Sequence, residues 1–284
     1  MFWKKRIERV ERPLEIQIET TNRCNAKCEF CHHRNMKRGL TDMSDELFLK
    51  LLKDLKEINP ENVHPFANGE MFLDKKIFDR LDLINHELPA AGIVVFTNGF
   101  LLDEERAEKL SRIRNIRLIN FSLNGFEPLD YKRRVGLDFK RVVANIKNVL
   151  RLNSERKFAE NIIVASVEHG KEDKVGNKIY NDSFCVFCRQ NFPGAEIKVG
   201  YKYNYISRIF SFRGFKDIHC QRLKNMVVLA NGLVALCCMD MEGEYILGNA
   251  NDRSLLDIYN GALAREYRKN KKSRMLPCRF CNMI

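Results

Sequence analysis

The chain has 284 residues, of which 45% are hydrophobic and 30% charged, a composition typical of a soluble globular protein with a sizeable core. No apolar run approaches the length that crosses a bilayer, and the charged start lacks the apolar stretch of a secretory signal. These features predict a cytoplasmic protein without a membrane partner, in which the ten cysteines stay reduced. The formal charge of +12 indicates solvated basic helix faces or an anionic partner. No zinc-finger, helix-turn-helix or RNA-recognition pattern supports nucleic acid as that partner.

The first predicted strand leads directly into a loop with three cysteines. Residues 14–20 alternate apolar and polar side chains, as a strand does. Cys24, Cys28 and Cys31 follow, and soft thiolates at this spacing select zinc, copper(I) or an iron–sulfur cluster. Three thiolates cannot close a tetrahedral zinc site unless neighbouring histidines join them. On a four-iron cube, three thiolates would leave one iron open for a small molecule.

Helical and strand patterns alternate along the chain after this loop. A charged arm, residues 1–13, precedes the first strand. Strict alternation predicts right-handed crossovers and a parallel sheet, with the chemistry at the carboxyl ends of the strands. The other predicted strands are residues 63–67, 92–97, 116–122, 162–167 and 196–201. The predicted helices lie between Ser44 and Pro60 and at residues 75–88, 103–112, 138–153 and 175–192.

Two further cysteines, Cys185 and Cys188, lie inside the predicted helix 175–192, beside Phe184 and Phe192. Free cysteines are commonly buried as small hydrophobes. We therefore expect these two thiols to pack in the core, with metal ligation as the alternative.

The region after residue 215 carries another set of cysteines. Two apolar runs flank the turn at Asn231 and Gly232, a pattern that predicts a β-hairpin, and residues 254–271 predict a helix. A hairpin brings cysteines near its two ends together, and a Cys-x2-Cys pair follows. Four such thiols suit a tetrahedral zinc site or a fully ligated iron–sulfur cluster. The set comprises Cys220, Cys237, Cys278 and Cys281, with Cys238 as the rival of Cys237.

The Cys-x3-Cys-x2-Cys motif, with Phe30 before its last cysteine, resembles that of the radical S-adenosylmethionine (SAM) superfamily. The resemblance implies an α/β fold, a partial (β/α)6 TIM-like barrel over residues 14–215. It also implies that Cys24, Cys28 and Cys31 bind a 4Fe–4S cluster whose open iron binds SAM. One electron from a reductant such as flavodoxin or ferredoxin then cleaves SAM to methionine and a 5′-deoxyadenosyl radical. That radical abstracts a hydrogen atom from the substrate.

Polar residues at the predicted strand ends match SAM-binding positions of the family. Asn68, Gly69 and Glu70 stand where the family has Gly-Gly-Glu-Pro, although Asn68 replaces a glycine and Met71 the proline. Glu70 can accept a hydrogen bond from the SAM ammonium. Turn or helix-capping roles are the alternative for these polar residues. The other positions that the resemblance implies for SAM are Thr97, Asn98, Ser122, Asn124 and Arg134.

The C-terminal cysteines resemble the SPASM/Twitch module of radical SAM enzymes. The spacing of Cys220, Gly232 and Cys237 matches the Cys-x(9–15)-Gly-x4-Cys motif of that module. The resemblance implies that residues 216–284 form a β-hairpin and a helix around one auxiliary 4Fe–4S cluster, as in the shorter Twitch form. Its implied ligands are the four cysteines named above, and a zinc knuckle is the alternative.

In size and cysteine layout the chain resembles the Twitch-type 2-deoxy-scyllo-inosamine dehydrogenase family. This resemblance implies an oxidoreductase in which the auxiliary cluster accepts an electron during oxidation of a sugar, a cyclitol or a related small molecule. The basic charge would suit an anionic substrate, and Asp240 is the candidate base. Two alternatives stay open: maturation of a ribosomally made precursor peptide or protein, and a non-enzymatic zinc- or nucleic-acid-binding role.

Overall fold

The computed structural model describes residues 11–168, 174–206, 208, 218–271 and 274–282. In this part of the chain one sheet has the strand order β6-β5-β4-β3-β2-β1-β7-β8-β9. Strands β1 to β6 are parallel, β7 pairs in parallel with β1, and β8 and β9 continue the sheet in antiparallel pairing. The parallel strands are β1 (Glu15–Ile18), β2 (Asn62–His64), β3 (Gly92–Thr97), β4 (Ile116–Ser122), β5 (Ala159–Val167), β6 (Glu196–Gly200) and β7 (Met226–Val228). The last two strands are β8 (Leu233–Ala235) and β9 (Ile246–Asn249).

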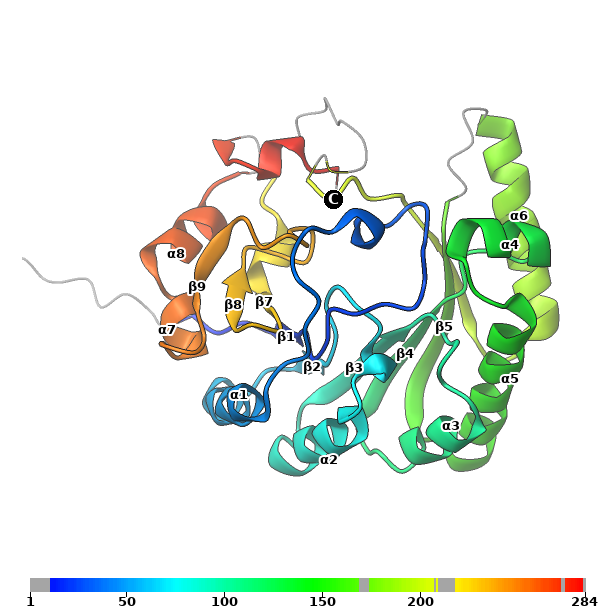
Figure 1. Cartoon of the computed structure of the whole chain (residues 1–284), viewed down its shortest axis with the longest axis horizontal. Coiled ribbons are helices and arrows are strands. Elements are labelled where there is room, and N and C mark those ends of the chain that lie inside the picture. Colours follow the sequence, from blue (N-terminus) through cyan, green and yellow to red (C-terminus); the bar gives the residue numbers. More distant parts are fainter. Residues whose placement is uncertain (1–10, 169–173, 207, 209–217, 272–273, 283–284) are drawn as a thin grey trace, which may run out of the picture.

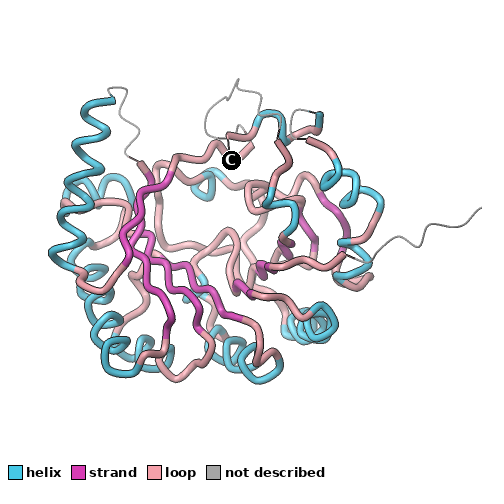
Figure 2. The backbone as a smooth tube through the Cα atoms, turned by 180° about the vertical axis from the view of Figure 1, so that it is seen from behind, coloured by secondary structure: helices cyan, strands magenta, loops and turns pink. Residues whose placement is uncertain are grey.

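Helices cover the outer side of the curved parallel sheet, and loops surround its open inner side (Figures 1 and 2). The arrangement confirms the predicted partial (β/α)6 barrel, because each parallel connection crosses over through a helix. The helices of this part are α1 (Asp45–Ile58), α2 (Ile77–Glu87), α3 (Glu104–Leu110), α4 (Pro128–Val135), α5 (Phe139–Arg156) and α6 (Lys174–Asn191).

Local sequence signals explain where these helices begin, end and pack. Ser44 accepts a hydrogen bond from the backbone N–H of Leu47, which caps the start of α1. Asn59 ends the helix in the left-handed conformation, with φ of 51°. Leu51 and Leu55 are fully buried on the face that packs on the strands. The amphipathic pattern therefore places α1 on the sheet.

Most predicted elements of the barrel are present with small changes in length. Strands β3 and β4 have the predicted bounds, whereas β2 ends at His64, earlier than predicted. The sequence did not predict α4, whose eight residues are strongly charged and bury only three side chains. The expected core packing of the helix α6 thiols is confirmed, since Cys188 is fully buried and Cys185 packs against the same core.

The C-terminal part contains the predicted hairpin, β7 and β8, and an unpredicted third strand, β9. The single helix predicted at residues 254–271 is wrong. Two short helices, α7 (Leu255–Tyr259) and α8 (Ala262–Lys269), meet at Asn260 and Gly261. Gly261 precedes α8 with extended backbone, which stops the first helix from continuing into the second.

The pairing of β7 with β1 makes the C-terminal elements a continuation of the barrel sheet. The predicted boundary between residues 215 and 216 lies outside the described residues, as do residues 1–10 of the predicted arm. Among the helices that the structure describes, none is long and apolar enough to cross a membrane.

Candidate functional site

The cysteine loop follows β1 and lies on the inner side of the sheet, between the parallel strands and the C-terminal elements (Figure 1). Two backbone hydrogen bonds of 2.9 Å fix it to the end of α4, from Lys27 N–H to the Val135 carbonyl and from Glu29 N–H to the Arg134 carbonyl. The side chain of Asn98 donates a hydrogen bond of 2.8 Å to that of Asn25. The loop is therefore held by the end of α4 and by the residue that follows β3.

The three thiols of this loop are partly buried and close enough to interact electrostatically. The pKa of Cys24 is raised to about 12, mainly by burial and then by the nearby Glu70 carboxylate and Cys31 thiol. Burial also raises the pKa values of Cys28 and Cys31. Such thiols stay protonated until a metal replaces the proton. A set of three thiols on one loop fits a four-iron cluster that keeps one iron open.

Glu70 belongs to a turn that packs directly against the start of the cysteine loop. Its backbone N–H donates to the Arg23 carbonyl at 2.8 Å. A Cβ atom on the preceding Gly69 would lie 2.6 Å from the carbonyl oxygens of Thr21 and Arg23. Only glycine therefore allows this close approach of the two backbones. Although Asn68 and Met71 depart from the family's Gly-Gly-Glu-Pro turn, this chain keeps Gly69, the residue on which the close approach of the two backbones depends.

The Glu70 carboxylate is fully enclosed at the carboxyl end of β3. It accepts hydrogen bonds from the Thr97 hydroxyl at 2.7 Å and from the Asn98 N–H at 2.8 Å. Burial raises the pKa of Glu70 from 4.5 to about 7, although these two donors and Phe72 N–H oppose the change. A carboxylate in this position can bind an ammonium group, which would favour its charged form.

We expect the raised pKa of Glu70 to make the protein without SAM less stable as the pH rises from about 4.5 to about 7. In this window the folded state holds a proton that the unfolded state has released. Stability that is fully present below pH 4.5 is therefore lost as the pH rises through 7. The shift corresponds to about 3 kcal/mol, at about 1.4 kcal/mol per pKa unit. Urea unfolding over this pH range, compared with a Glu70→Gln variant, isolates the effect. Parallel pH profiles of the two proteins would contradict it.

Two of the other predicted SAM positions have structural partners at the end of β4. Asn124 adopts φ of 59°, and its side chain accepts a hydrogen bond from Val167 N–H at 2.8 Å. The same amide donates to the Ser122 carbonyl at 3.1 Å. These bonds join the ends of β4 and β5, and contacts of Ser122 and Asn124 with SAM stay a prediction.

Arg134 is buried behind the cysteine loop. Its guanidinium forms an ion pair of 3.3 Å with Glu29 and donates a hydrogen bond of 3.2 Å to the Tyr180 hydroxyl. It also lies over the rings of Phe30 and Tyr180, at 5.5 and 5.4 Å from their centres. Arg134 therefore supports the loop that carries the thiols, and contact with the SAM carboxylate stays a prediction.

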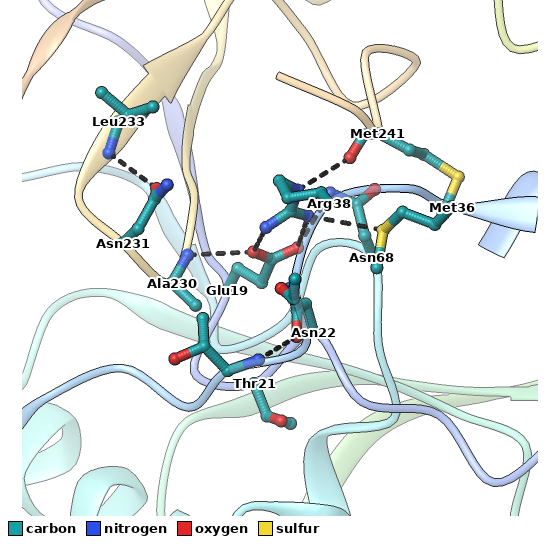
Figure 3. A network of polar contacts seen from close by, with 12 residues as sticks. Glu19, Thr21, Asn22, Met36, Arg38, Asn68, Ala230, Asn231, Leu233 and Met241 are labelled. Atoms are coloured by element: carbon teal, nitrogen blue, oxygen red, sulfur yellow. Dashed lines mark hydrogen bonds and ion pairs between the residues drawn. The ribbon is translucent and has the colours of Figure 1, made fainter.

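A buried ion pair, which the sequence did not predict, joins the cysteine loop to the rest of the site (Figure 3). Glu19, at the end of β1, is fully buried and accepts two hydrogen bonds of 2.7 and 2.8 Å from Arg38. It also accepts hydrogen bonds of 2.9 Å from the Asn68 side chain and from Ala230 N–H. Arg38 in turn donates to the Met241 carbonyl at 3.0 Å. One carboxylate thus connects the loop, the Glu70 turn and the C-terminal hairpin.

A second carboxylate, Glu242, attaches the C-terminal part to the far side of the cysteine loop. It lies 2.7 Å from the buried His32 ring and accepts hydrogen bonds of 3.1 Å from the backbone N–H groups of Lys37 and Arg38. His32 directly follows the last cysteine of the loop. The C-terminal part therefore helps to position the first set of thiols.

The second set of cysteines surrounds a small internal cavity, which we call the cysteine cavity. The cysteines that line it are Cys220, Cys237, Cys278 and Cys281. Cys238 does not line it, but burial and the nearby Cys220 and Cys281 thiols raise the pKa of Cys238, so the choice of Cys237 over Cys238 stays a prediction. Burial, and then the nearby Cys238, Cys278 and Cys281 thiols, raise the pKa of Cys237. Four thiols around one small cavity fit a fully ligated iron–sulfur cluster.

Neither cysteine set is arranged around one ion. Within the described residues no group of three or more His, Cys, Asp and Glu side chains could hold a single metal ion.

The candidate base Asp240 caps a turn, where its carboxylate accepts hydrogen bonds from the backbone N–H groups of Glu244 and Tyr245 at 3.1 and 2.8 Å. Burial raises the pKa of Asp240. Its role as a base stays a prediction.

Tyr205, also unpredicted, lies between the two sets of thiols. Its hydroxyl contacts the Cys31 sulfur at 4.0 Å. Its side chain packs in a small cluster with Cys237, Cys238 and Cys281. The backbone of Tyr205 adopts φ of 46°, which no local pattern in the sequence predicts. The fold therefore places the Tyr205 side chain next to cysteines that are about two hundred residues apart in the sequence.

Comparison with known proteins assigns family models to two parts of the chain. A family model of the radical SAM superfamily matches residues 18–172, and a model of an iron–sulfur cluster-binding domain, SPASM, matches residues 220–282. These two domains imply SAM and 4Fe–4S clusters as cofactors, in agreement with the donor sets described above.

Curated relatives match about half of this chain. A probable GTP 3′,8-cyclase of Saccharolobus islandicus is 31% identical over 146 residues, which are 51% of this chain and 46% of the cyclase. A SAM-dependent 2-deoxy-scyllo-inosamine dehydrogenase of Niallia circulans is 26% identical over 157 residues, 53% of this chain and 62% of that enzyme. The matched part thus spans about half the length of the cyclase and less than two thirds of the dehydrogenase.

Solved structures with the same fold cover nearly the whole chain. BtrN in complex with AdoMet and 2-DOIA superposes with a TM-score of 0.63 at 17% identity, over 97% of this chain and 95% of BtrN. Streptococcus suis SuiB bound to the precursor peptide SuiA gives a TM-score of 0.69 at 15% identity, over 95% of this chain and 70% of SuiB. At these identities the likeness establishes the fold.

Proposed function

Since this chain belongs to the radical SAM superfamily, we propose that it is an oxidoreductase that oxidises a sugar, a cyclitol or a related small molecule. The observation that carries the proposal is the position of Tyr205, which contacts a thiol of the first set and packs against thiols of the second. Two redox groups so placed can serve one substrate in consecutive one-electron steps. The similarity to the SAM-dependent 2-deoxy-scyllo-inosamine dehydrogenase of Niallia circulans supports the same class of reaction.

Each group of residues has a separate role in the proposed reaction. When bound, SAM and its cluster supply the agent that abstracts a hydrogen atom, and an auxiliary cluster supplies a one-electron acceptor. The thiols of the cysteine loop hold the first cluster, and Glu70 receives the ammonium group of SAM. The thiols of the cysteine cavity hold the second cluster. Asp240 is the candidate base that accepts the proton which the substrate hydroxyl releases when its carbon is oxidised.

Maturation of a peptide is the second candidate function, and one feature favours it. Strand β6 lies at an edge of the described sheet, where an extended peptide could add as a further strand. SuiB, which was solved with its precursor peptide, shares the fold. Assays with cyclitols and amino sugars on one side, and precursor peptides on the other, would separate the two substrate classes. A non-enzymatic role is not retained, because the radical SAM superfamily model matches more than half of the chain.

We expect Cys220→Ala or Cys281→Ala to leave SAM cleavage in place but to abolish formation of oxidised product. Both residues line the cysteine cavity, whereas the cysteine loop is left intact. Iron in the anaerobically reconstituted protein should fall from about eight to about four atoms per chain. Iron analysis, with measurement of methionine and product release, checks the prediction. Unchanged iron content, or full product formation without these thiols, would refute an auxiliary cluster at this site.

A further inference from the structure

Cys220 lies at the boundary between two cavities. On one side it lines the cysteine cavity together with the other three thiols. On the other side it lines a larger pocket of about 660 Å³, which we call the outer pocket. The thiol itself is partly exposed. A redox group held in the cysteine cavity would therefore be separated from the outer pocket by one ligand side chain.

The outer pocket is predominantly basic. Arg12, His219, Lys224 and Arg268 line it, and Glu11 is the one acidic residue among the described lining residues. Glu11 forms an ion pair of 2.9 Å with Arg268 and so neutralises that guanidinium. Arg12 and Lys224 are exposed on the surface. The charge that remains for a partner is therefore positive.

The inner part of the outer pocket is structurally braced. The Arg268 guanidinium stacks on the Tyr259 ring, at 3.8 Å from its centre, and its side chain is only 10% exposed. The Tyr259 hydroxyl donates a hydrogen bond of 2.9 Å to the Lys224 carbonyl. These contacts join α8, α7 and the segment before β7 into one wall. The exposed Arg12 and Lys224 side chains can change without loss of this wall.

We infer that the surface around the outer pocket is the docking site of an acidic one-electron carrier protein. The inference rests on the proposed function, because a carrier docked beside Cys220 can exchange an electron only if the C-terminal cysteines hold a redox group. In the exchange, the carrier gains one electron and the C-terminal site loses the one that it took up from the substrate. No atom is transferred, and the substrate proton leaves separately.

Two features favour a protein partner over a small anion. The buried cation of the outer pocket, Arg268, already has a carboxylate partner. The remaining charges, those of Arg12 and Lys224, are exposed. Exposed charges of one sign steer an oppositely charged protein by long-range attraction. They provide little of the enclosure that binds a small ligand.

The test compares two charge reversals of equal size in the reconstituted protein. One variant carries Arg12→Glu and Lys224→Glu at the outer pocket. The control carries Lys140→Glu and Lys147→Glu, which are exposed on α5. Binding of oxidised flavodoxin, used as an acidic carrier, is measured by fluorescence titration at low salt and at about 0.5 M salt. The rate of its one-electron reduction by the pre-reduced protein is followed in the same samples.

We expect the outer-pocket variant to bind flavodoxin at least about tenfold more weakly at low salt, with little difference at high salt. The control should remain within about twofold of the unchanged protein. Equal weakening by both variants would overturn the docking site. Displacement of flavodoxin by ATP, with ATP binding lost in the outer-pocket variant, would instead identify a small-anion site and also overturn it.

Iron analysis of a Cys24/Cys28/Cys31→Ala variant separates this inference from the proposed function. Iron retained at about four atoms per chain shows that the C-terminal cluster is present, so the binding result then decides the docking site alone. Absence of iron would overturn the proposed function. The charge dependence of flavodoxin binding would still be readable, because it needs no cluster.

Discussion

Replacing Cys24, Cys28 or Cys31 by alanine is expected to abolish SAM cleavage, with a loss of at least about a thousandfold. Each thiol is one of only three that the cysteine loop offers to a cluster, and a four-iron cube with one open iron needs all three of them. Loss of one ligand therefore leaves a second iron without a protein ligand, so the cluster that binds SAM is not held. Release of methionine from SAM under anaerobic reducing conditions measures the effect.

Cys185→Ala is the matched control for this prediction. Cys185 is also a partly buried thiol, but it packs on α6 against the core and lines neither cysteine set. The control should keep full iron content and SAM cleavage, with only a modest loss of stability. Cleavage that persists in any one of the three loop variants would show that this thiol does not hold the cluster.

Much of the fold was predictable because the barrel elements carry strong local patterns. Strand β3 is an almost continuously buried run, and β4 buries Ile116, Ile119 and Phe121; the bounds of both agree with the predicted ones. The cysteine loop could be found from spacing alone, since its three thiols are within one short segment. The break between α7 and α8 was missed because the apolar pattern continues across Gly261, which alone marks the end.

The contacts that assemble the site could not be predicted, because they join residues far apart in sequence. Glu19 and Ala230 are separated by 211 positions, and their hydrogen bond exists only because β7 pairs with β1. The sequence does show that an acidic residue, Glu19, follows a buried strand, but this pattern does not identify Arg38 or Ala230 as its partners. Tyr205 lies in a segment without regular structure, so no periodic pattern placed it between the cysteine sets.

Glu19→Ala is expected to lower the free energy of unfolding by about 3 to 5 kcal/mol. The substitution leaves the Arg38 guanidinium, which is only 10% exposed, without its carboxylate partner. It also removes the acceptor for Asn68 and for Ala230 N–H. Unpaired buried donors and an uncompensated buried charge both cost free energy. Urea unfolding of the metal-free protein measures the loss, and the exposed Glu57→Ala on α1 is the control.

A double-mutant cycle distinguishes this ion pair from general packing at the same place. Arg38→Ala should be similarly destabilising, because it leaves the Glu19 carboxylate buried and unpaired. The double variant should be more stable than the sum of the two losses predicts, since it removes both charges together. SAM cleavage should fall in all three variants, because Arg38 fixes the loop that carries the thiols to the Met241 carbonyl. Strictly additive losses would show that the two side chains act independently, and the proposed link between the loop and the C-terminal hairpin would then fail.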